Sequence, residues 1–232
     1  MPQRNASGTG DSLFSPALFQ FLRQLRDHND REWFQANKAR YEADVKGPML
    51  AFVAAFAEPL EGISRHCFAD PRPVGGSMFR INRDTRFAND KSPYKTNVGA
   101  HFRHRACTRE VHSPGFYLHL EPGGCFASAG LWHPDPDSLR QVRERIVAKP
   151  RAWNALQAGG IEVLGEALKR VPQGFDPGHP AAEQLKLKDF YCHLPLTERE
   201  VCAPDFLARF TEACRQGAPL VAFLAKALEL PW

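Results

Sequence analysis

One stretch of the sequence, residues 79–97, concentrates side chains that bind anions. It reads FRINRDTRFANDKSPYKTN and carries a net charge of +3, because five cations outnumber two carboxylates. A guanidinium presents a planar fork of donors that matches phosphate or carboxylate oxygens, and an ammonium adds a point charge. The stretch therefore predicts a site for a phosphorylated or otherwise anionic small ligand. Its candidate residues are Arg80, Arg83, Asp84, Arg86, Asp90, Lys91, Tyr94 and Lys95.

Polar side chains on the strands expected just after this stretch extend the candidate site. In residues 99–105 and 116–121, apolar and polar side chains alternate, which is typical of strands with one apolar face and one polar face. Catalysis on a bound ligand would use His119 or an aspartate as the base, although no dyad or triad is legible. The polar face adds His101, Arg103, Tyr117 and His119 to the candidate residues.

The same charges allow two other interpretations. In the first, Arg83 and Arg86 hold Asp84 and Asp90, so that the loop is a salt-bridged clamp on the helices of a structural or partner-binding protein. In the second, Asp84 and Asp90 bind a metal with His119 or Glu121, but no ligand spacing supports it, and we expect no metal site. His101 and His104 would lie on opposite strand faces and cannot share a metal.

Nucleic acid is the competing partner, with Phe79, Phe87 and Tyr94 stacking on bases between the basic residues. The formal charge of +4 and the sequence pI of about 8.8 are only mildly basic. Dedicated nucleic-acid binders more often show clustered Lys and Arg over a whole domain. We therefore favour an anionic small molecule over nucleic acid. Whether a cofactor takes part is unknown from the sequence.

The stretch also resembles the hallmark of a family of bacterial and fungal proteins, the domain-of-unknown-function family 2461. The similarity extends to NDREWFQANKARY at residues 29–41, GFYLHLEPGGCFASAG at 115–130 and LKRVPQGFDPGHP at 168–180. It thus covers nearly the whole chain beyond the first residues. The resemblance does not identify an activity, a cofactor or a catalytic residue for this chain. Ala88 stands where the family pattern usually has a serine, so no hydroxyl is available at that position.

Helices are expected to flank the strands. Ser15 and Pro16 open the first, with Leu18, Leu22 and Leu25 at helical spacing. A second helix, capped by Asn29, is expected to end at Gly47-Pro48. A third buries Phe52, Val53, Phe56 and Leu60. Asp135-Pro136 starts another that Pro150 ends, and Gly217 separates two last helices that begin near Pro204 and Pro219.

Between the helices, short aromatic segments predict an antiparallel sheet. The expected strands are residues 77–83, 99–105, 116–121, 125–132 and 189–194, with Pro122-Gly123-Gly124 as a hairpin turn rather than a phosphate cradle. Trp132 either ends a strand in the core or lines a pocket. The fold class is therefore α+β, an antiparallel sheet of four to six strands with helices packed mainly on its apolar face.

Composition limits the compartment and the domain count. Residues 1–12 have no apolar run and are expected to form a disordered leader before a single domain over 13–232. Six scattered cysteines without a signal peptide indicate reduced thiols and a cytoplasmic protein. No apolar run reaches the length of a membrane span. The oligomeric state is not predictable from these features.

Overall fold

The computed structural model describes residues 12–86, 88–107 and 113–232. The expected leader, residues 1–12, lies outside these ranges except for Ser12. Phe87, one of the aromatic residues expected to stack on bases, lies outside them as well.

The N-terminal region is helical, as its apolar spacing predicts. Leu18, Leu22 and Leu25 are buried, and Ser15 and Pro16 open the first helix, although the Ser15 hydroxyl forms no capping hydrogen bond. Four of the apolar residues of the predicted third helix are fully buried. The helical segments are α1 (Pro16–Asp27), α2 (Arg31–Ala36), α3 (Lys38–Arg40), the π-helical segment η1 (Tyr41–Lys46) and α4 (Gly47–Glu61).

Two details of this region correct the sequence prediction. Asp30, not Asn29, caps α2, and its carboxylate accepts from the Trp33 amide at 2.8 Å. The predicted break at Gly47-Pro48 is wrong, because the helical turns continue through it. The Gly47 amide donates to the Glu42 carbonyl five residues earlier, which is the hydrogen bond of a wide π turn. Pro48 follows directly, at the start of α4.

The described residues of the middle region form a four-stranded antiparallel sheet in the order β1-β2-β3-β4. Three strands match the expected ones closely, and the turn at Pro122-Gly123-Gly124 joins β2 to β3, with the Gly124 amide donating to the Glu121 carbonyl at 2.9 Å. The fourth, β4, also confirms an expected strand. The bounds are β1 (Val98–Arg103), β2 (Gly115–Leu120), β3 (Cys125–Leu131) and β4 (Phe190–Leu196).

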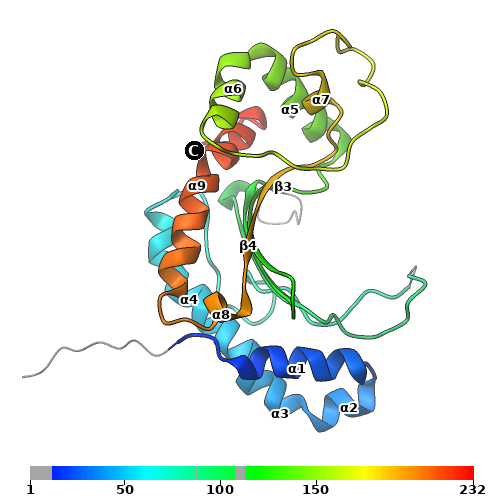
Figure 1. Ribbon diagram of the computed structural model, residues 1–232, viewed down its shortest axis with the longest axis vertical. Coiled ribbons are helices and arrows are strands. Elements are labelled where there is room, and N and C mark those ends of the chain that lie inside the picture. The colour runs from blue at the N-terminus through cyan, green and yellow to red at the C-terminus, as the bar shows by residue number, and fades with distance from the viewer. Residues whose placement is uncertain (1–11, 87, 108–112) are drawn as a thin grey trace, which may run out of the picture.

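The expected strand at residues 77–83 does not form. Met78 makes an isolated bridge with Ala100 of β1, and the chain then leaves the sheet. Asn82 pairs instead with Tyr94, so the described residues from 80 to 97 fold back on themselves as a projecting arm. Turn-forming residues within the arm favour this local pairing over a long run beside β1. Residues 80–86 and 88–97 are called the arm below, and Figure 1 shows them extending away from the sheet.

The C-terminal part returns to helices. Asp135 caps α5, and Pro150 ends it and opens α6. The predicted break at Gly217 is wrong, because α9 runs through both Gly217 and Pro219. The elements here are α5 (Pro136–Ala148), α6 (Pro150–Ala158), α7 (Ala182–Leu185), α8 (Glu198–Val201) and α9 (Phe206–Ala227), and a short 3-10 turn, η2 (Arg105–Cys107), follows β1.

The sheet separates a helical layer from an open face. Helix α9 packs along β3, and α4 packs against α9 on the same side of the sheet (Figure 1). Phe52, Phe56, Phe102 and Phe210 meet between these layers in ring contacts of 4.7 to 6.4 Å. The fold is therefore α+β, with an antiparallel sheet that carries its main helices on the apolar face, as predicted.

Each outer strand of the sheet is partly covered. Beside β1, the Phe79 amide donates to the Gly99 carbonyl at 2.9 Å. Beside β4, Leu164 and Tyr191 exchange two backbone hydrogen bonds of 2.7 and 3.2 Å. Farther along β4, Pro195 has no N–H to offer.

Candidate functional site

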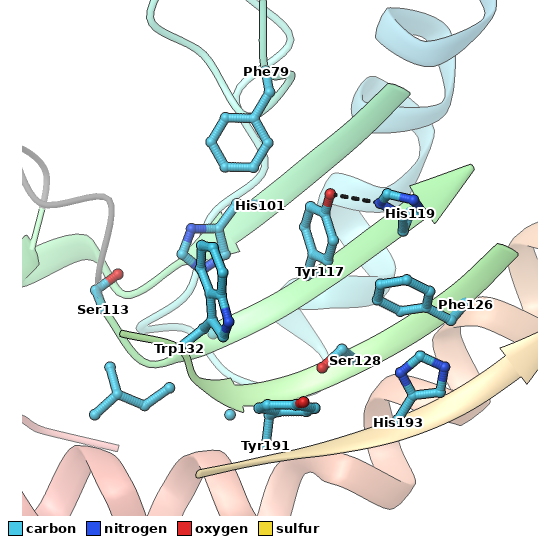
Figure 2. Close-up of a pocket in the computed structure, with 13 residues that line it drawn as sticks. Phe79, His101, Ser113, Tyr117, His119, Phe126, Ser128, Trp132, Tyr191 and His193 are labelled. Atoms are coloured by element: carbon cyan, nitrogen blue, oxygen red, sulfur yellow. Dashed lines mark hydrogen bonds between the residues drawn. The ribbon is translucent and has the colours of Figure 1, made fainter. Parts of the chain in front are cut away.

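The polar face of the sheet forms the floor of a cavity of about 460 Å³. Because side chains alternate along a strand, every second residue of the four strands points to this face. The strand register aligns His101, Tyr117, Ser128 and His193 in one row across the whole sheet. Figure 2 shows these four side chains rising from neighbouring strands.

Two further rows complete the floor. In one, His119 of β2 lies opposite Phe126 of β3, and the rings stack with centroids 4.6 Å apart. In the other, Gly115 and Gly130 lie opposite each other, and the His101 ring and Tyr191 of β4 pack against them. A Cβ on Gly115 would lie 3.0 Å from His101 Nε2, and one on Gly130 would lie 2.9 Å from the Tyr191 Cβ.

The walls come from segments beside the sheet. Phe79, just before the arm, lies over the floor with its ring centroid 6.0 Å from that of Tyr117 (Figure 2). Trp132 follows β3 and borders the cavity with 59% of its surface exposed, so it lines a pocket and is not a core residue. Ser113 is 2% exposed, borders the cavity, and its hydroxyl has no hydrogen-bond partner among the described residues.

A chain of hydrogen bonds joins three side chains at one end of the cavity. The Tyr117 hydroxyl lies 3.0 Å from His119 Nδ1, and His119 Nε2 lies 3.1 Å from Glu121 Oε2. The other carboxylate oxygen of Glu121 accepts from the Thr96 hydroxyl at 3.4 Å. An ionised carboxylate only accepts, so Nε2 carries a proton, and in the neutral ring Nδ1 then accepts from Tyr117. We assign this tautomer from the hydrogen-bond pattern.

Burial changes the acidity of groups in this cavity. It raises the pKa of Tyr117 to about 12, and the nearby charge of Glu121 adds to the effect. The phenol therefore stays protonated at neutral pH. Burial also lowers the pKa of His193, and the neighbouring His119 lowers it further. Both changes follow from the cost of placing a charge in a poorly hydrated place.

The predicted anion-binding residues at the tip of the arm bond to one another. Arg83 pairs with Asp90, and Arg86 pairs with Asp84 through two hydrogen bonds of 2.7 and 3.0 Å. The bond from Arg86 holds the pKa of Asp84 at about 2, and the Ser92 hydroxyl, followed by Arg83, lowers the pKa of Asp90.

Lys91, also at the tip, donates to the Thr85 carbonyl at 3.0 Å. The Arg86–Asp84 pair is exposed to solvent, whereas in the other pair Asp90 is exposed and Arg83 is partly buried. These two ion pairs and the Lys91 hydrogen bond join residues of the tip to one another.

The root of the arm is fastened to the helical layer. Tyr94 is buried and stacks on Phe34 with ring centroids 4.1 Å apart. The Asn29 side chain donates to the Tyr94 carbonyl at 3.0 Å and accepts from its amide at 3.1 Å. Tyr94 is therefore a structural anchor here and does not face the cavity.

Two cations lie at the root of the arm beside the cavity wall. Lys95 Nζ is 5.4 Å from the centre of the Phe79 ring, and burial followed by the charge of Arg80 lowers the pKa of Lys95. Neither Lys95 nor Arg80 forms an ion pair with a carboxylate of the described residues. Arg103 lies over the ring of Phe68 at 5.5 Å. None of these three cations is among the described residues that line the cavity; Lys95 reaches it only through its contact with Phe79.

No group of three His, Cys, Asp or Glu side chains is placed to hold a metal ion in the part of the chain that the structure describes. His101 lies in the cavity, whereas His104 is buried on the other side of β1, so the two point apart as expected.

No described helix is long and apolar enough to cross a bilayer. All six cysteines are free thiols, as predicted.

Of the candidate residues, the structure brings Tyr117, His119 and His101 together in the cavity. Sequence reasoning missed the contributions of β3 and β4, although both strands were expected. The available signal was alternation within 125–132 and 189–194, which puts polar and aromatic side chains on the face opposite the core. The missed residues on these strands are Phe126, Ser128, Tyr191 and His193; Ser113, which precedes β2, was also missed and has no such signal.

Comparison with known proteins agrees with the resemblance. No curated protein matches the chain. Residues 17–223 match the model of a family described as conserved hypothetical protein (DUF2461), which spans the helical layer, the arm and the whole sheet. The chain belongs to the DUF2461 family.

Proposed function

We propose that this protein binds a small organic molecule in the cavity on the polar face of the sheet. The observation that carries the proposal is the cavity itself, about 460 Å³ in volume and walled mainly by rings. Sites for small molecules are typically concave, largely apolar, and supplied with a few convergent polar groups. The rings are those of Phe79, Tyr117, Phe126, Trp132 and Tyr191.

The lining also supports a class of ligand. Aromatic walls favour a flat, partly apolar body, and the histidines and Ser128 of the floor, with Ser113 of the wall, offer hydrogen bonds for orientation. Lys95 and Arg80 lie at the Phe79 end, where an acidic group of the ligand would meet their charge. The preferred ligand is thus an aromatic carboxylate or phosphate. The anionic ligand predicted from the sequence is retained, with its body in the cavity and not on the tip of the arm.

A thermal-shift screen with aryl carboxylates and aryl phosphates tests this proposal. A compound present at about 100 times its Kd stabilises the folded state by about 2.7 kcal/mol, which raises the Tm of a chain of this size by roughly 5–10 °C. Trp132→Ala removes an exposed wall and is expected to weaken binding without loss of stability. Absence of any shift across both classes would overturn the proposal.

A matched pair of lysines tests the position of the acidic group. Lys95→Met is expected to weaken aryl carboxylate binding, because it removes the charge beside Phe79. Lys91→Met removes the same charge from the exposed tip of the same arm, where the ammonium bonds to a carbonyl, and should leave binding unchanged. Equal losses of aryl carboxylate affinity in both variants would contradict the placement of the acidic group beside Lys95.

Submicromolar binding of a single-stranded oligonucleotide at about 0.15 M salt would favour the nucleic-acid alternative instead.

A further inference from the structure

We propose that Tyr117, His119 and Glu121 form a proton relay that removes a proton from a small organic acid bound in the cavity, with the Tyr117 oxygen as the atom that meets the substrate. This inference rests on the proposed binding function and adds a reaction to it. Tyr117 is then the catalytic residue, and His119 and Glu121 act through it.

The direction of the relay follows from its hydrogen bonds. Tyr117 has one proton, and it points to His119 Nδ1 at 3.0 Å, because Nε2 uses its own proton on Glu121 at 3.1 Å. The lone pairs of the Tyr117 oxygen are therefore available to accept a hydrogen bond from a substrate in the cavity. Figure 2 shows the Tyr117 hydroxyl directed to His119 at the end of the cavity below Phe79.

The surroundings hold the relay in place. The His119 ring stacks on Phe126. The other neighbour of Phe126 is His193, and the centroids of the Phe126 and His193 rings are 4.2 Å apart. A Cβ on Gly99 would lie 2.4 Å from the Tyr117 oxygen, so the phenol packs directly over that glycine. Thr96 binds the second oxygen of Glu121. A phenol and an imidazole fixed on rigid strands are arranged to transfer protons with little reorganisation.

The chemistry balances without a co-reactant. An acidic C–H bond of the substrate breaks, its proton passes to the Tyr117 oxygen, and the phenolic proton of Tyr117 passes to His119 Nδ1. The substrate becomes an enolate, and the new imidazolium faces the Glu121 carboxylate. Tyr117 then gives a proton to another atom of the enolate, and His119 Nδ1 returns its proton to the Tyr117 oxygen. These two transfers complete a tautomerisation. Because burial raises the pKa of Tyr117 to about 12, the phenol works through this concerted transfer and not as a free phenolate.

Phenylpyruvate is a suitable probe, because it combines an aromatic ring, a carboxylate and acidic C–H bonds next to a ketone. In D2O, the wild-type protein is expected to exchange the benzylic hydrogens at least tenfold faster than buffer alone, measured by proton NMR. Tyr117→Phe should bind phenylpyruvate with similar affinity but exchange about 100-fold more slowly, since general acid–base groups contribute factors of this size. His28→Gln removes an exposed histidine far from the cavity along the chain and should not change the rate.

A second measurement determines which nitrogen of His119 carries the proton in the protein without a ligand. At pH 8, where an imidazole is ordinarily neutral, long-range proton–nitrogen correlation spectra should show His119 protonated at Nε2, and Glu121→Gln should alter this signature. Glu121→Asp should restore part of the exchange rate that Glu121→Gln removes.

The outcomes separate the two proposals. Binding of phenylpyruvate without exchange, or a proton on His119 Nδ1 in the free protein, would overturn the relay and leave the binding function standing. Failure of phenylpyruvate to bind the wild-type protein, together with the absence of any hit among the aryl acids, would overturn both.

Discussion

At the tip of the arm, Arg83 and Arg86 pair with the two carboxylates that the clamp interpretation assigned to them. The Arg86–Asp84 pair lies in solvent, with 76% of the Arg86 side chain exposed, and in the other pair 60% of the Asp90 side chain but only 29% of the Arg83 side chain is exposed. Ion pairs of this kind contribute little to stability, because water screens the charges and the side chains lose freedom. Pairing alone therefore does not make the tip a clamp.

Alanine substitution of either arginine tests this conclusion. Arg83→Ala and Arg86→Ala are each expected to keep the Tm within about 2 °C of the wild type. Thermal unfolding with and without 10 mM phosphate is the measurement. A fall of more than about 5 °C would mean that the arginines clamp the fold after all. A rise with phosphate that the wild type shows and both variants lack would instead support an anion site at the tip.

Gly99 makes a second prediction at the scale of one residue. Its added methyl group would lie 2.4 Å from the Tyr117 oxygen and 2.8 Å from a ring carbon. Gly99→Ala is therefore expected to swing the phenol away from His119 and abolish proton exchange on phenylpyruvate, while the strand pairing persists. Circular dichroism and the exchange assay together check this. Unchanged exchange would show that the phenol position is not needed.

The residues of the cavity were predictable in part. Alternation along β2 places Tyr117 and His119 on the polar face without any knowledge of the fold. His193 joins them only because β3 pairs with β4, a partner that follows it by about sixty residues. That pairing depends on the packing of both strands against α9 and has no local signal.

Among the elements, α9 shows why a sequence rule failed. Glycine and proline usually end helices, yet Gly217 lies in the middle of α9, where the helix crosses β3. A Cβ on Gly217 would lie 2.4 Å from the Ala129 methyl and 3.3 Å from the Cys192 sulfur. The glycine thus permits close packing rather than a break, and the small residues of β3 serve the same contact. Helices whose burial follows a regular period, such as α1 and α4, were predictable.

The contact between α9 and β3 makes a prediction for stability. In an exposed helix, glycine to alanine stabilises by about 0.5–1 kcal/mol. Gly217→Ala is expected to destabilise instead, by about 1–3 kcal/mol, because it overpacks the interface. Urea unfolding is measured for Gly217→Ala, for Ala129→Gly and for the double variant that combines them. The double variant should recover part of the loss, and additive losses would show that the two residues do not interact.

At the scale of the whole molecule, a buried histidine ties the C-terminus to the sheet. His104 Nε2 donates to the Pro231 carbonyl at 2.7 Å, and its Nδ1 accepts from the Ala106 amide at 3.2 Å. This pattern requires the neutral ring. Burial lowers the pKa of His104, the bond to Pro231 opposes this, and the stacked His66 adds to the lowering.

The buried, neutral His104 predicts that the free energy of unfolding depends on pH. The unfolded chain takes up a proton on His104 near pH 6.5, whereas the folded protein does so only at lower pH. Its contribution to stability is therefore complete above about pH 6.5 and is lost as the pH falls below it. Urea unfolding at pH 7.5 and 5.5 should show this loss in the wild type and a smaller one in His104→Asn. An equal loss in both would assign the pH dependence to other groups.

The two outer strands carry a final consequence for the behaviour of many copies in solution. Open rows of amide and carbonyl groups at a sheet edge act as templates on which further chains polymerise. Here residues 77–79 occupy part of the β1 edge, Leu164 occupies part of the β4 edge, and Pro195 interrupts the rest. A concentrated solution of the folded protein should therefore resist fibre growth, and loss of the segment around Leu164 would expose the protein to it.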